Sequence, residues 1–383
     1  MPPLPGDSPM AVPLKILCII DGLGPGGAQR QLVTLACGLH ARGHQIELFL
    51  YHPDETFFRP QIDACGLAVH TSDRTAIHQV GILRSLSRLT RRGGFDIVLS
   101  YLDRPNVYAE LASVLVRGGR LVVSERSSYL REGSGASPVV RRWLHRLADH
   151  VVANSETQAK WLRRKRWLAD KVSCIYNGLD LAAFETASLV PAQATDVRLL
   201  AIGRIGVEKN LVNLIKALGL LHDGDQVVPE IGWVGRQHPH PAGLAYRAEV
   251  DALLRARPEI AARWHWLGER SDVPHLLGAY HALIHPSLFE GLPNVVCEAM
   301  AAGKPVLVSD VCDHPALVAD GQRGFLFDPT DPARIAAAIT RLTASSPDEW
   351  RTLSRNARVF AEERLGIERM VDAYEALFAD LVA

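Results

Sequence analysis

Short apolar runs alternate along the chain with longer stretches in which hydrophobic residues recur at helical spacing. In the first half, the runs that predict β-strands are Lys15–Ile20, Ile46–Tyr51, Ile97–Ser100, Leu121–Ser124 and Val151–Ala153. In the second half, they are Leu199–Ile202, Glu230–Val234, Trp264–Leu267, Ala282–His285, Pro305–Val308 and Gly324–Phe327. Helix-like stretches such as Ala28–Arg42 and Asn106–Val116 separate them. This alternation is typical of βαβ units, so the pattern predicts an α/β fold with parallel sheets.

A small, polar, proline-containing segment, Glu185–Asp196, interrupts the alternation and is typical of a linker. A length of 383 residues also favours two domains over one core. We therefore predict two Rossmann-like, doubly wound domains over residues 1–184 and 185–366, and an amphipathic helix over residues 367–383. Because ligands of open α/β sheets bind beyond the carboxyl ends of the strands, the two domains are expected to face each other across an interdomain cleft.

The formal net charge is zero, but it is unevenly distributed. Residues 1–180 carry 23 Lys and Arg against 16 Asp and Glu, whereas residues 181–383 carry 19 against 26. A positive first half favours an anionic partner such as a lipid surface, a phosphorylated acceptor or nucleic acid. An uneven drift of solvated surface charge is the alternative.

The cysteines show neither a Cys-x-x-Cys pair nor a regular spacing, and most have apolar neighbours: Cys18, Cys37, Cys65, Cys174, Cys297 and Cys312. This pattern predicts buried free thiols and a reducing compartment. The first residues lack the basic-then-apolar order of a signal peptide, and no window holds 18 apolar residues without charge. We therefore expect a cytoplasmic protein, either free or peripheral at the inner face of the cell membrane.

The segment His285–Val306 (HPSLFEGLPNVVCEAMAAGKPV) places two glutamates around a turn. Pro293 is excluded from a helix interior, and Asn294 is a favourable N-cap for a helix that follows. Glu290 is then expected in the loop before this helix and Glu298 about one turn into it. The unpaired N–H groups between them, with the positive end of the helix dipole, suit a phosphate. With a carboxylate on either side to accept from hydroxyls, the arrangement suits a sugar–diphosphate–ribose ligand.

Two cations follow the first strand of the second domain. Arg204 comes directly after this strand, and Lys209 lies in the segment RIGVEKN, which leads into a helix at Leu211. A guanidinium offers a planar fork to phosphate oxygens, and an ammonium offers a mobile point charge. Both should lie at the carboxyl end of the sheet, where the Glu290 loop should also arrive. The alternative is a solvated helix N-terminus with an ion pair to Glu208.

In the first domain, the first strand runs into Asp21 and a glycine-rich turn, GLGPGGAQR, that opens a helix. Glycines at such a turn let the backbone approach a ligand closely, so Gly26 and Gly27 are candidates for phosphate or sugar contact. Plain turn geometry is the alternative, because any tight βα turn uses glycine.

Together these motifs resemble those of glycosyltransferase family 4. The segments GLGPGGAQRQL, NGLD (Asn177–Asp180), IGRIGVEKN, GERSDVP (from Gly268) and the His285–Val306 segment occur in the family's order and span nearly the whole chain. The resemblance implies a retaining, nucleotide-sugar-dependent enzyme of the GT-B type, with two Rossmann-like domains. The pattern Glu290-x7-Glu298 is highly specific, whereas the glycine-rich turn is not.

The resemblance also implies roles for single residues. Arg204, Lys209 and Glu290 would be catalytic: the two cations would bind the donor diphosphate and stabilise it as a leaving group, and Glu290 would contact the donor sugar. Glu298 would accept from the ribose hydroxyls. Backbone N–H groups would hold sugar and phosphate along Gly291, Leu292, Pro293, Asn294 and Val295. The nucleobase would be framed by Arg270, Ser271 and Val273. The last helix would cross back to the first domain.

This chemistry agrees with the charges involved. Cleavage of an anomeric C–O bond builds negative charge on the diphosphate and positive charge on the sugar. Two cations and a helix N-terminus stabilise the negative charge. A carboxylate stabilises the positive charge. No Asp-x-Asp pair placed as a metal site accompanies these residues. We therefore expect transfer without a metal ion or another cofactor.

The acceptor side departs from the commonest family pattern. Many relatives have a histidine after the strand Leu121–Ser124, whereas this chain has Glu125 and Arg126, as some members do. The acceptor-side base is thus unassigned. Glu125 and Asp21 are candidates for contact with either sugar, with capping of a βα loop as the alternative. Arg104 is a candidate for an acceptor phosphate, with an ion pair to a neighbouring acid as the alternative.

The stretch Ser137–Lys171 interleaves nine basic residues with three tryptophans: Arg141, Arg142, Arg146, Lys160, Arg163, Arg164, Lys165, Arg166 and Lys171, with Trp143, Trp161 and Trp167. This composition suits the headgroup zone of an anionic membrane. The alternative is two ordinary helices with solvated basic faces and buried tryptophans. No RNA-binding motif accompanies the basic residues, so nucleic acid is not an expected partner.

The sequence therefore predicts transfer of a hexose or N-acetylhexosamine from a nucleoside-diphosphate sugar to a glycan or polyprenyl-diphosphate-linked acceptor in surface polysaccharide biosynthesis. The alternatives are a sugar-nucleotide epimerase of the same two-domain fold and a catalytically silent scaffold subunit. An epimerase would isomerise the donor without an acceptor. A silent subunit would not require Arg204, Lys209, Glu290 and Glu298 together.

Overall fold

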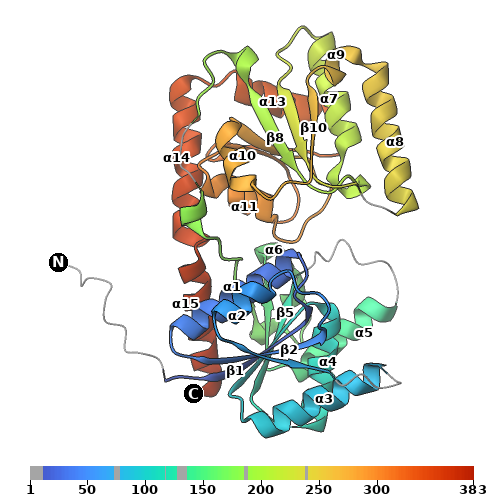
Figure 1. The fold of residues 1–383 in the computed structure, drawn as a ribbon. Helices are drawn as coiled ribbons and strands as arrows, with labels where there is room; N and C mark the ends of the chain where they lie inside the picture. The colour runs from blue at the N-terminus through green and yellow to red at the C-terminus, as the bar shows by residue number, and fades with distance from the viewer. Residues whose placement is uncertain (1–11, 73–77, 117, 127–135, 185–188, 238–239) are drawn as a thin grey trace, which may run out of the picture. The chain divides into compact units, whose positions relative to one another are not determined.

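The computed structural model describes residues 12–72, 78–116, 118–126, 136–184, 189–237 and 240–383 (Figure 1). The backbone divides into two compact units. Unit 1 comprises Met1–Gly178 and Ile367–Ala383, and unit 2 comprises Leu179–Gly366. The chain thus changes unit between residues 178 and 179, whereas the sequence analysis drew the border between 184 and 185.

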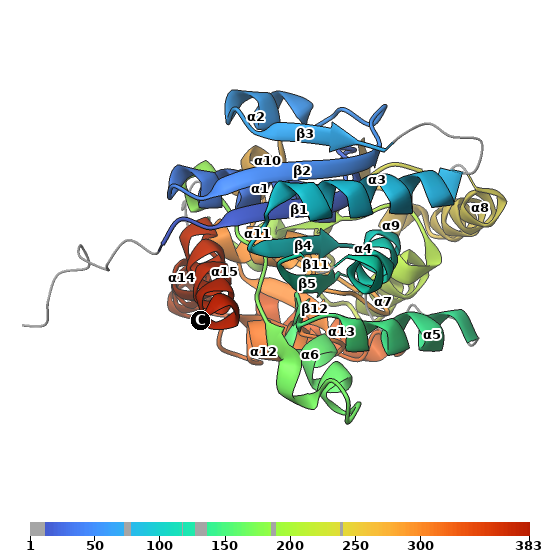
Figure 2. The same ribbon diagram turned by 90° about the horizontal axis from the view of Figure 1, so that it is seen from below.

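Unit 1 is built on a seven-stranded parallel sheet in the order β3-β2-β1-β4-β5-β6-β7 (Figure 2). The strands are β1 Lys15–Gly22, β2 Gln45–His52, β3 Ala68–Thr71, β4 Ile97–Tyr101, β5 Arg120–Glu125, β6 His150–Ala153 and β7 Val172–Cys174. The helices are α1 Gly27–Ala41, α2 Arg59–Ala64, α3 His78–Gly93, α4 Asp103–Leu115, α5 Ala136–Leu144, α6 Glu156–Arg163 and α15 Ile367–Val382, with 3-10 turns at η2 His145–Leu147 and η3 Ala169–Lys171.

Helices cover both faces of this sheet. Helices α1, α2 and α15 pack on one face through side chains such as Leu32, Ile62 and Phe378. Helices α3, α4 and α6 pack on the other through side chains such as Leu86 and Leu162. Because both faces are covered, the central strands are apolar throughout, which is why they were recognisable in the sequence.

Unit 2 is built on a six-stranded parallel sheet in the order β10-β9-β8-β11-β12-β13. The strands are β8 Arg198–Ile202, β9 Glu230–Val234, β10 Trp264–Gly268, β11 Ala282–His285, β12 Val306–Ser309 and β13 Gly324–Phe327. The helices are α7 Leu211–Asp223, α8 Pro241–Ala256, α9 Pro258–Ala261, α10 Val273–Ala279, α11 Asn294–Ala301, α12 His314–Val318, α13 Pro332–Thr343 and α14 Pro347–Arg364, with 3-10 turns at η4 Leu181–Ala183, η5 Ala194–Asp196 and η6 Val207–Lys209.

The predicted fold class, α/β with two doubly wound, Rossmann-like units, is confirmed. The sequence did not predict β3 and β7, which are the two edge strands of unit 1. Their side chains are largely half-buried or exposed, so no continuous apolar run marks them. Among the described residues, no helix is long and apolar enough to cross a membrane.

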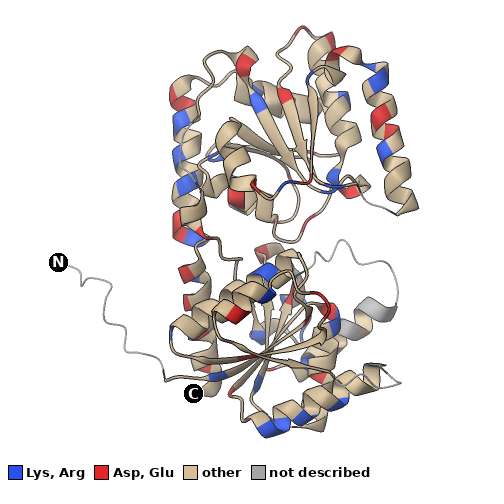
Figure 3. Ribbon diagram, viewed as in Figure 1, with Lys and Arg blue, Asp and Glu red and all other residues tan. Residues whose placement is uncertain are grey.

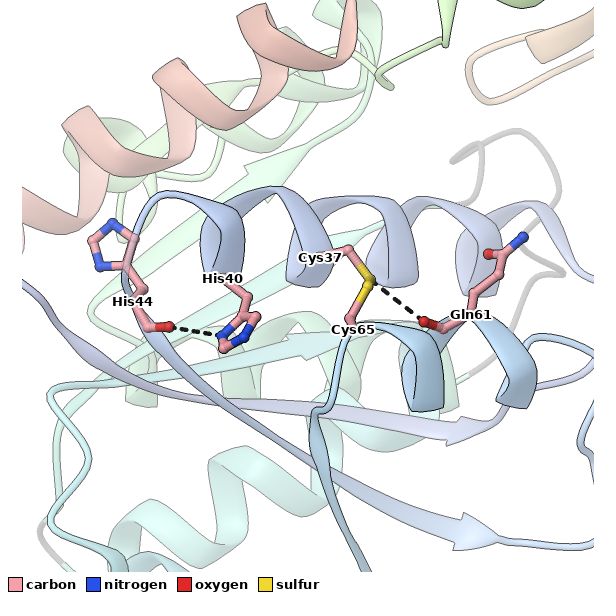
Figure 4. The surroundings of a disulfide bond; sticks show 5 residues. All are labelled: Cys37, His40, His44, Gln61 and Cys65. Carbon is pink, nitrogen blue, oxygen red and sulfur yellow. Dashed lines mark hydrogen bonds between the residues drawn. A yellow bond between two sulfur atoms is a disulfide. The ribbon is translucent and has the colours of Figure 1, made fainter.

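The prediction that all cysteines are free thiols is wrong for one pair. Cys37 of α1 and Cys65, which follows α2, form a disulfide with Cα atoms 6.0 Å apart (Figure 4). Their separation of 28 residues gives no local spacing signal, because the parallel packing of α1 and α2 on one sheet face brings them together. Cys18, Cys174, Cys297 and Cys312 form no disulfide, and of these Cys18 and Cys297 are buried. Disulfides are typical of oxidising compartments, so this pair does not support the predicted reducing one.

Candidate functional site

In unit 2, the winding of the sheet reverses between β8 and β11, which are neighbours although distant in sequence. Ligands of open α/β sheets bind at such switch points, beyond the carboxyl ends of the strands. The loop after β8 carries Arg204 and Lys209, and the loop after β11 carries Glu290. The sheet order therefore places the three predicted catalytic residues on two adjacent loops.

Asn210 ties these two loops together. Its backbone is left-handed, with φ of 59°, and its buried side-chain amide donates to the carbonyl oxygens of Pro286 at 3.1 Å and Pro329 at 2.7 Å. The Leu288 N–H also donates to the Glu208 carbonyl at 2.9 Å. These bonds hold Lys209, which directly precedes Asn210, beside the loop that follows β11.

Lys209, Glu290 and His285 form one polar cluster. The Lys209 ammonium pairs with Oε1 of Glu290, and His285 Nε2 lies 2.9 Å from the same oxygen. Ser287 Oγ lies 3.0 Å from His285 Nε2, and the Glu290 N–H donates to Cys312 Sγ at 3.3 Å. Only 17% of the Lys209 and Glu290 side chains is exposed, so the pair is largely shielded from water but still reachable.

This environment keeps Glu290 ionised. Burial alone would raise the pKa of its carboxyl group, but the hydrogen bond from His285 and the charge of Lys209 outweigh burial and hold that pKa well below its usual range. Burial and the Lys209 charge lower the pKa of His285. The cluster is thus an ammonium and a carboxylate joined to a neutral imidazole, with one positive and one negative charge available to a ligand.

The backbone next to Arg204 is fixed by hydrogen bonds of Gly203, whereas the Arg204 side chain is exposed to solvent. Its neighbour Gly203 donates to the Val234 carbonyl at 2.8 Å and accepts from Trp233 Nε1 at 3.0 Å. A Cβ on Gly235, whose φ is 151°, would lie 2.0 Å from the Gly203 carbonyl oxygen, so glycine is required for this close approach. Within the described residues, the exposed Arg204 side chain forms neither a hydrogen bond nor an ion pair.

Helix α11 begins one residue earlier than predicted. Pro293 is its N-cap and Asn294 its first helical residue, so the prediction of Asn294 as the N-cap is wrong. No side chain caps this end, and the N–H groups of Val296 and Cys297 bond to the Pro293 carbonyl. Glu298 lies one turn into the helix and is 6% exposed.

The other members of the predicted donor segment differ in exposure. Leu292 is buried, whereas Gly291 and Val295 are half-buried. The loop between β10 and α10 is more open: Arg270 and Ser271 are exposed, and Val273 is the first residue of α10. The Arg270 guanidinium makes two hydrogen bonds to Asp272, at 2.8 and 2.6 Å, which order the loop itself. An exposed pair of this kind contributes little stability.

In unit 1 the switch point lies between β1 and β4. Asp21 is the next-to-last residue of β1, and its Oδ1 accepts from the Gly22 N–H and from Gln29 Nε2, both at 2.9 Å. Gly26 is the N-cap of α1 and Gly27 its first residue. The Asp21 carboxylate therefore braces the glycine-rich turn, which was its predicted alternative role.

Glu125, the last residue of β5, belongs to a buried network that the sequence did not reveal. His145 Nε2 lies 2.7 Å from Glu125 Oε1, and His145 Nδ1 lies 2.5 Å from Glu110 Oε1. Glu110 and His145 are 0% and 2% exposed. Burial would lower the pKa of His145, but the two carboxylates raise it to about 10. An imidazolium is thus held between two acidic side chains.

Arg126 contacts the interior of unit 1. Its guanidinium donates to Asn177 Oδ1 and, at 3.2 Å, to the Tyr374 hydroxyl, and it lies 3.9 Å from the centre of the Tyr101 ring. These contacts join β5 to α15. A role at the acceptor stays a prediction, and bracing of the last helix is the use that the contacts show.

Sequence reasoning missed Asn210, Glu110 and His145 as parts of the two networks. Glu110 had one signal, since it is an acid within an apolar helical stretch, where burial requires a partner. His145 had none, because it lies among exposed basic residues. His285 was expected near the donor loop, and it lies there.

Comparisons with known proteins cover most of the chain. Residues 25–183 match a family model described as Glycosyltransferase Family 4, and residues 196–345 match one described as Glycosyl transferases group 1. The chain is 24% identical to UDP-Gal:alpha-D-GlcNAc-diphosphoundecaprenol alpha-1,3-galactosyltransferase of Escherichia coli, over 78% of this chain and 79% of that protein. It is 30% identical to D-inositol 3-phosphate glycosyltransferase of Streptomyces scabiei, over 71% of this chain and 65% of that protein.

Solved structures share the fold over nearly the whole chain. The structure of Anabaena Alr3699/HepE in complex with UDP matches with a TM-score of 0.82 and 22% identity, over 96% of this chain and 100% of that one. The lipopolysaccharide outer core galactosyltransferase WaaB matches with a TM-score of 0.75 and 17% identity, over 96% of this chain and 100% of that one. At these identities the structural matches concern the fold alone.

Proposed function

The chain belongs to glycosyltransferase family 4 and has its GT-B fold, and we propose that it transfers a hexose or N-acetylhexosamine from a nucleoside-diphosphate sugar with retention of anomeric configuration. The acceptor in this proposal is a glycan or a polyprenyl-diphosphate-linked sugar of surface polysaccharide biosynthesis. The observation that carries it is the cluster of Lys209, Glu290 and His285 at the switch point of unit 2, where the loop of Lys209 also carries Arg204. The names of the Escherichia coli relative and of the UDP-bound Anabaena structure support the donor and acceptor classes.

In this mechanism the donor diphosphate binds where Lys209 and Arg204 can both reach it. Lys209 is already positioned by its pairing with Glu290, so its ammonium need not be ordered when the ligand arrives. As the anomeric bond breaks, the two cations and the uncapped end of α11 stabilise the charge on the departing diphosphate. Glu290, kept ionised, faces the developing positive charge on the sugar.

The remaining assignments complete the proposal. Glu298 accepts from the ribose hydroxyls, and the segment Arg270–Val273 frames the base. In unit 1, Arg104 contacts the acceptor phosphate. The transfer proceeds without a metal ion, because two cations already meet the diphosphate charge.

A donor screen tests the proposal. We expect one of the uridine, guanosine or adenosine diphosphate sugars to raise the melting temperature of the wild-type protein. Glu298→Ala should weaken that donor by roughly 10- to 100-fold, because a hydrogen bond to a charged group is worth about 1.5–3 kcal/mol. Glu249→Ala, which changes an exposed glutamate on α8, is the matched control. Equal affinities in the three proteins would contradict the assignment of Glu298.

The same donor decides between reaction classes. With acceptor, nucleoside diphosphate should be released, and the new linkage should keep the donor's anomeric configuration when it is followed by NMR. A chelator should leave the rate unchanged. Isomerised donor without acceptor would instead identify an epimerase, and an absence of turnover with every donor would favour a silent subunit.

We further propose that unit 1 rests on an anionic membrane surface. Helix α3 carries four arginines and no acidic residue (Figure 3). Helix α5 exposes Val139, Val140 and Trp143, by 63%, 54% and 52%, and Arg146 lies 4.9 Å from the Trp143 ring. Not all of the basic, tryptophan-containing stretch can take part, because Trp161 packs into the core and Lys171 donates to backbone carbonyls. The side chain of Arg141 lies outside the described residues.

Vesicle sedimentation tests this surface. The protein should bind phosphatidylglycerol vesicles and not phosphatidylcholine vesicles, and salt should weaken binding. Trp143→Ala should lower the affinity by roughly tenfold, since burial of a large apolar side chain contributes about 1.5–3 kcal/mol. Leu220→Ala, at a residue 49% exposed in unit 2, should have no effect. Equal binding by both variants would rule out the α5 surface.

A further inference from the structure

An apolar cavity of about 500 Å³ lies between α3 and α4 in unit 1. The two helices lie side by side in both ribbon views (Figures 1 and 2) and are in contact. Val80 and Leu83 line the cavity from α3, and Val107 and Leu111 line it from α4. Val80 and Leu111 are 52% and 38% exposed, so the cavity opens to solvent. Its size falls in the range of small-molecule sites.

Two polar residues of α4, Arg104 and Tyr108, also line this cavity. Arg104 is exposed, and no hydrogen bond or ion pair of its side chain is recorded in the described part of the chain. Helix α3 also carries Arg84 and Arg88, which are both exposed, and it has no acidic residue. The cavity therefore combines an apolar lining with a cation at the first turn of α4, which suits a molecule with an apolar chain and an anionic head.

The cation lies at the carboxyl edge of the sheet. Arg104 is in the first turn of α4, directly after β4, at the switch point next to β1. The Tyr108 ring packs edge-on against Tyr51 of β2 at 5.5 Å between centroids. Burial, followed by the charge of Asp21, raises the pKa of Tyr51, and the charge of Arg104 opposes this rise. Asp21 lies at the end of β1, the strand next to β4, so Arg104 and Asp21 share the same edge of the sheet.

We propose that this cavity seats the first isoprene units of a polyprenyl-diphosphate-linked acceptor, with Arg104 on the diphosphate. The proposal rests on the proposed function and names the acceptor class for the same enzyme. An isoprenoid needs no hydrogen bonds, so the apolar side chains of α3 and α4 suffice for the chain. A diphosphate at Arg104 leaves its attached sugar at the carboxyl edge of the sheet, near Asp21 at the end of β1. The charges of α3 favour the same anionic ligand.

Equilibrium binding of radiolabelled farnesyl diphosphate to the full-length protein tests the site. Farnesyl diphosphate should bind more tightly than farnesol or inorganic diphosphate. Val80→Asp, Leu111→Asp and Arg104→Gln should each weaken it by at least tenfold. The matched control is Val114→Asp, because Val114 is on α4 and 64% exposed but does not line the cavity. The affinity of Val114→Asp for farnesyl diphosphate should stay within twofold of wild type.

Two results would overturn the proposal. One is an equal effect of Val114→Asp and Leu111→Asp, which would show contact with any exposed apolar surface. The other is displacement of farnesyl diphosphate by lysophosphatidylglycerol at equal concentration, which would make the cavity a general lipid contact. Donor binding, measured in parallel by thermal shift, should be unchanged in all four variants. If the wild type bound no donor, that result would contradict the proposed function but not the proposed isoprenoid site in this cavity.

Discussion

Replacing Lys209 with alanine is expected to reduce turnover by roughly 100-fold or more, with a smaller loss of donor affinity. Removal of one preorganised group that meets developing charge typically costs about two to three orders of magnitude in rate. Lys209 qualifies because it is held beside Glu290 by the bonds of Asn210, before any ligand binds. The variant also leaves the Glu290 carboxylate with one donor fewer, since His285 remains at 2.9 Å.

The control for this variant is Lys216→Ala, which removes an exposed lysine from the neighbouring helix α7. Both proteins should give the same circular dichroism spectrum, and nucleoside diphosphate release should be measured at saturating donor. A turnover within threefold of wild type for Lys209→Ala would show that the ammonium does not act on the leaving group. Arg204→Ala then separates the two cations, because Lys209 pairs with the partly buried Glu290, whereas the Arg204 side chain is exposed.

Replacing His145 with alanine is expected to destabilise unit 1 by about 3–5 kcal/mol, since breaking a buried charge network leaves uncompensated charge in the interior. His145 is 2% exposed and bridges Glu110 and Glu125. Chemical denaturation followed by circular dichroism measures the loss. His40→Ala, at an exposed histidine of α1, is the control and should be nearly neutral.

The contribution of His145 to the free energy of unfolding should depend on pH. Burial opposes protonation, but the two carboxylates raise the folded-state pKa of His145 to about 10, against 6.5 for an ordinary histidine. A raised pKa means that the folded state holds the proton more tightly, so the contribution is complete below pH 6.5 and is lost as the pH rises to 10. The difference in unfolding free energy between wild type and His145→Ala should therefore shrink over that range. A difference that stays constant from pH 6 to 10 would contradict the charged bridge.

Local sequence patterns were sufficient for most of the fold. Eleven strands were predicted close to their observed positions, because central strands buried on both faces are continuously apolar. The last helix was recognised from its apolar stripe, and the turn before α11 from Pro293. The strands β3 and β7 were missed because their short sequences, AVHT and VSC, contain no continuous apolar run. The N-cap of α11 was assigned one residue too late, since proline and asparagine are both acceptable at helix starts.

The candidate site was only partly determined by sequence. Residue types and spacing were enough to nominate Arg204, Lys209, Glu290 and Glu298. The pairing of Lys209 with Glu290, which are 81 residues apart, depended on β8 and β11 being neighbours. The bridge from Glu110 through His145 to Glu125, the disulfide of Cys37 with Cys65 and the cavity between α3 and α4 depended in the same way on packing.

What the sequence determined by itself is therefore local: periodicity, turns and the supply of charge at strand ends, and from these the fold class. The family followed from the resemblance of its motifs. Only the tertiary structure decided which of those charged side chains contact one another. A strand pattern is set by burial at neighbouring positions along the chain, whereas a contact between two loops is set by the order of strands in the sheet. That order depends on hydrogen bonds and packing between segments far apart in sequence, and no local pattern encodes it.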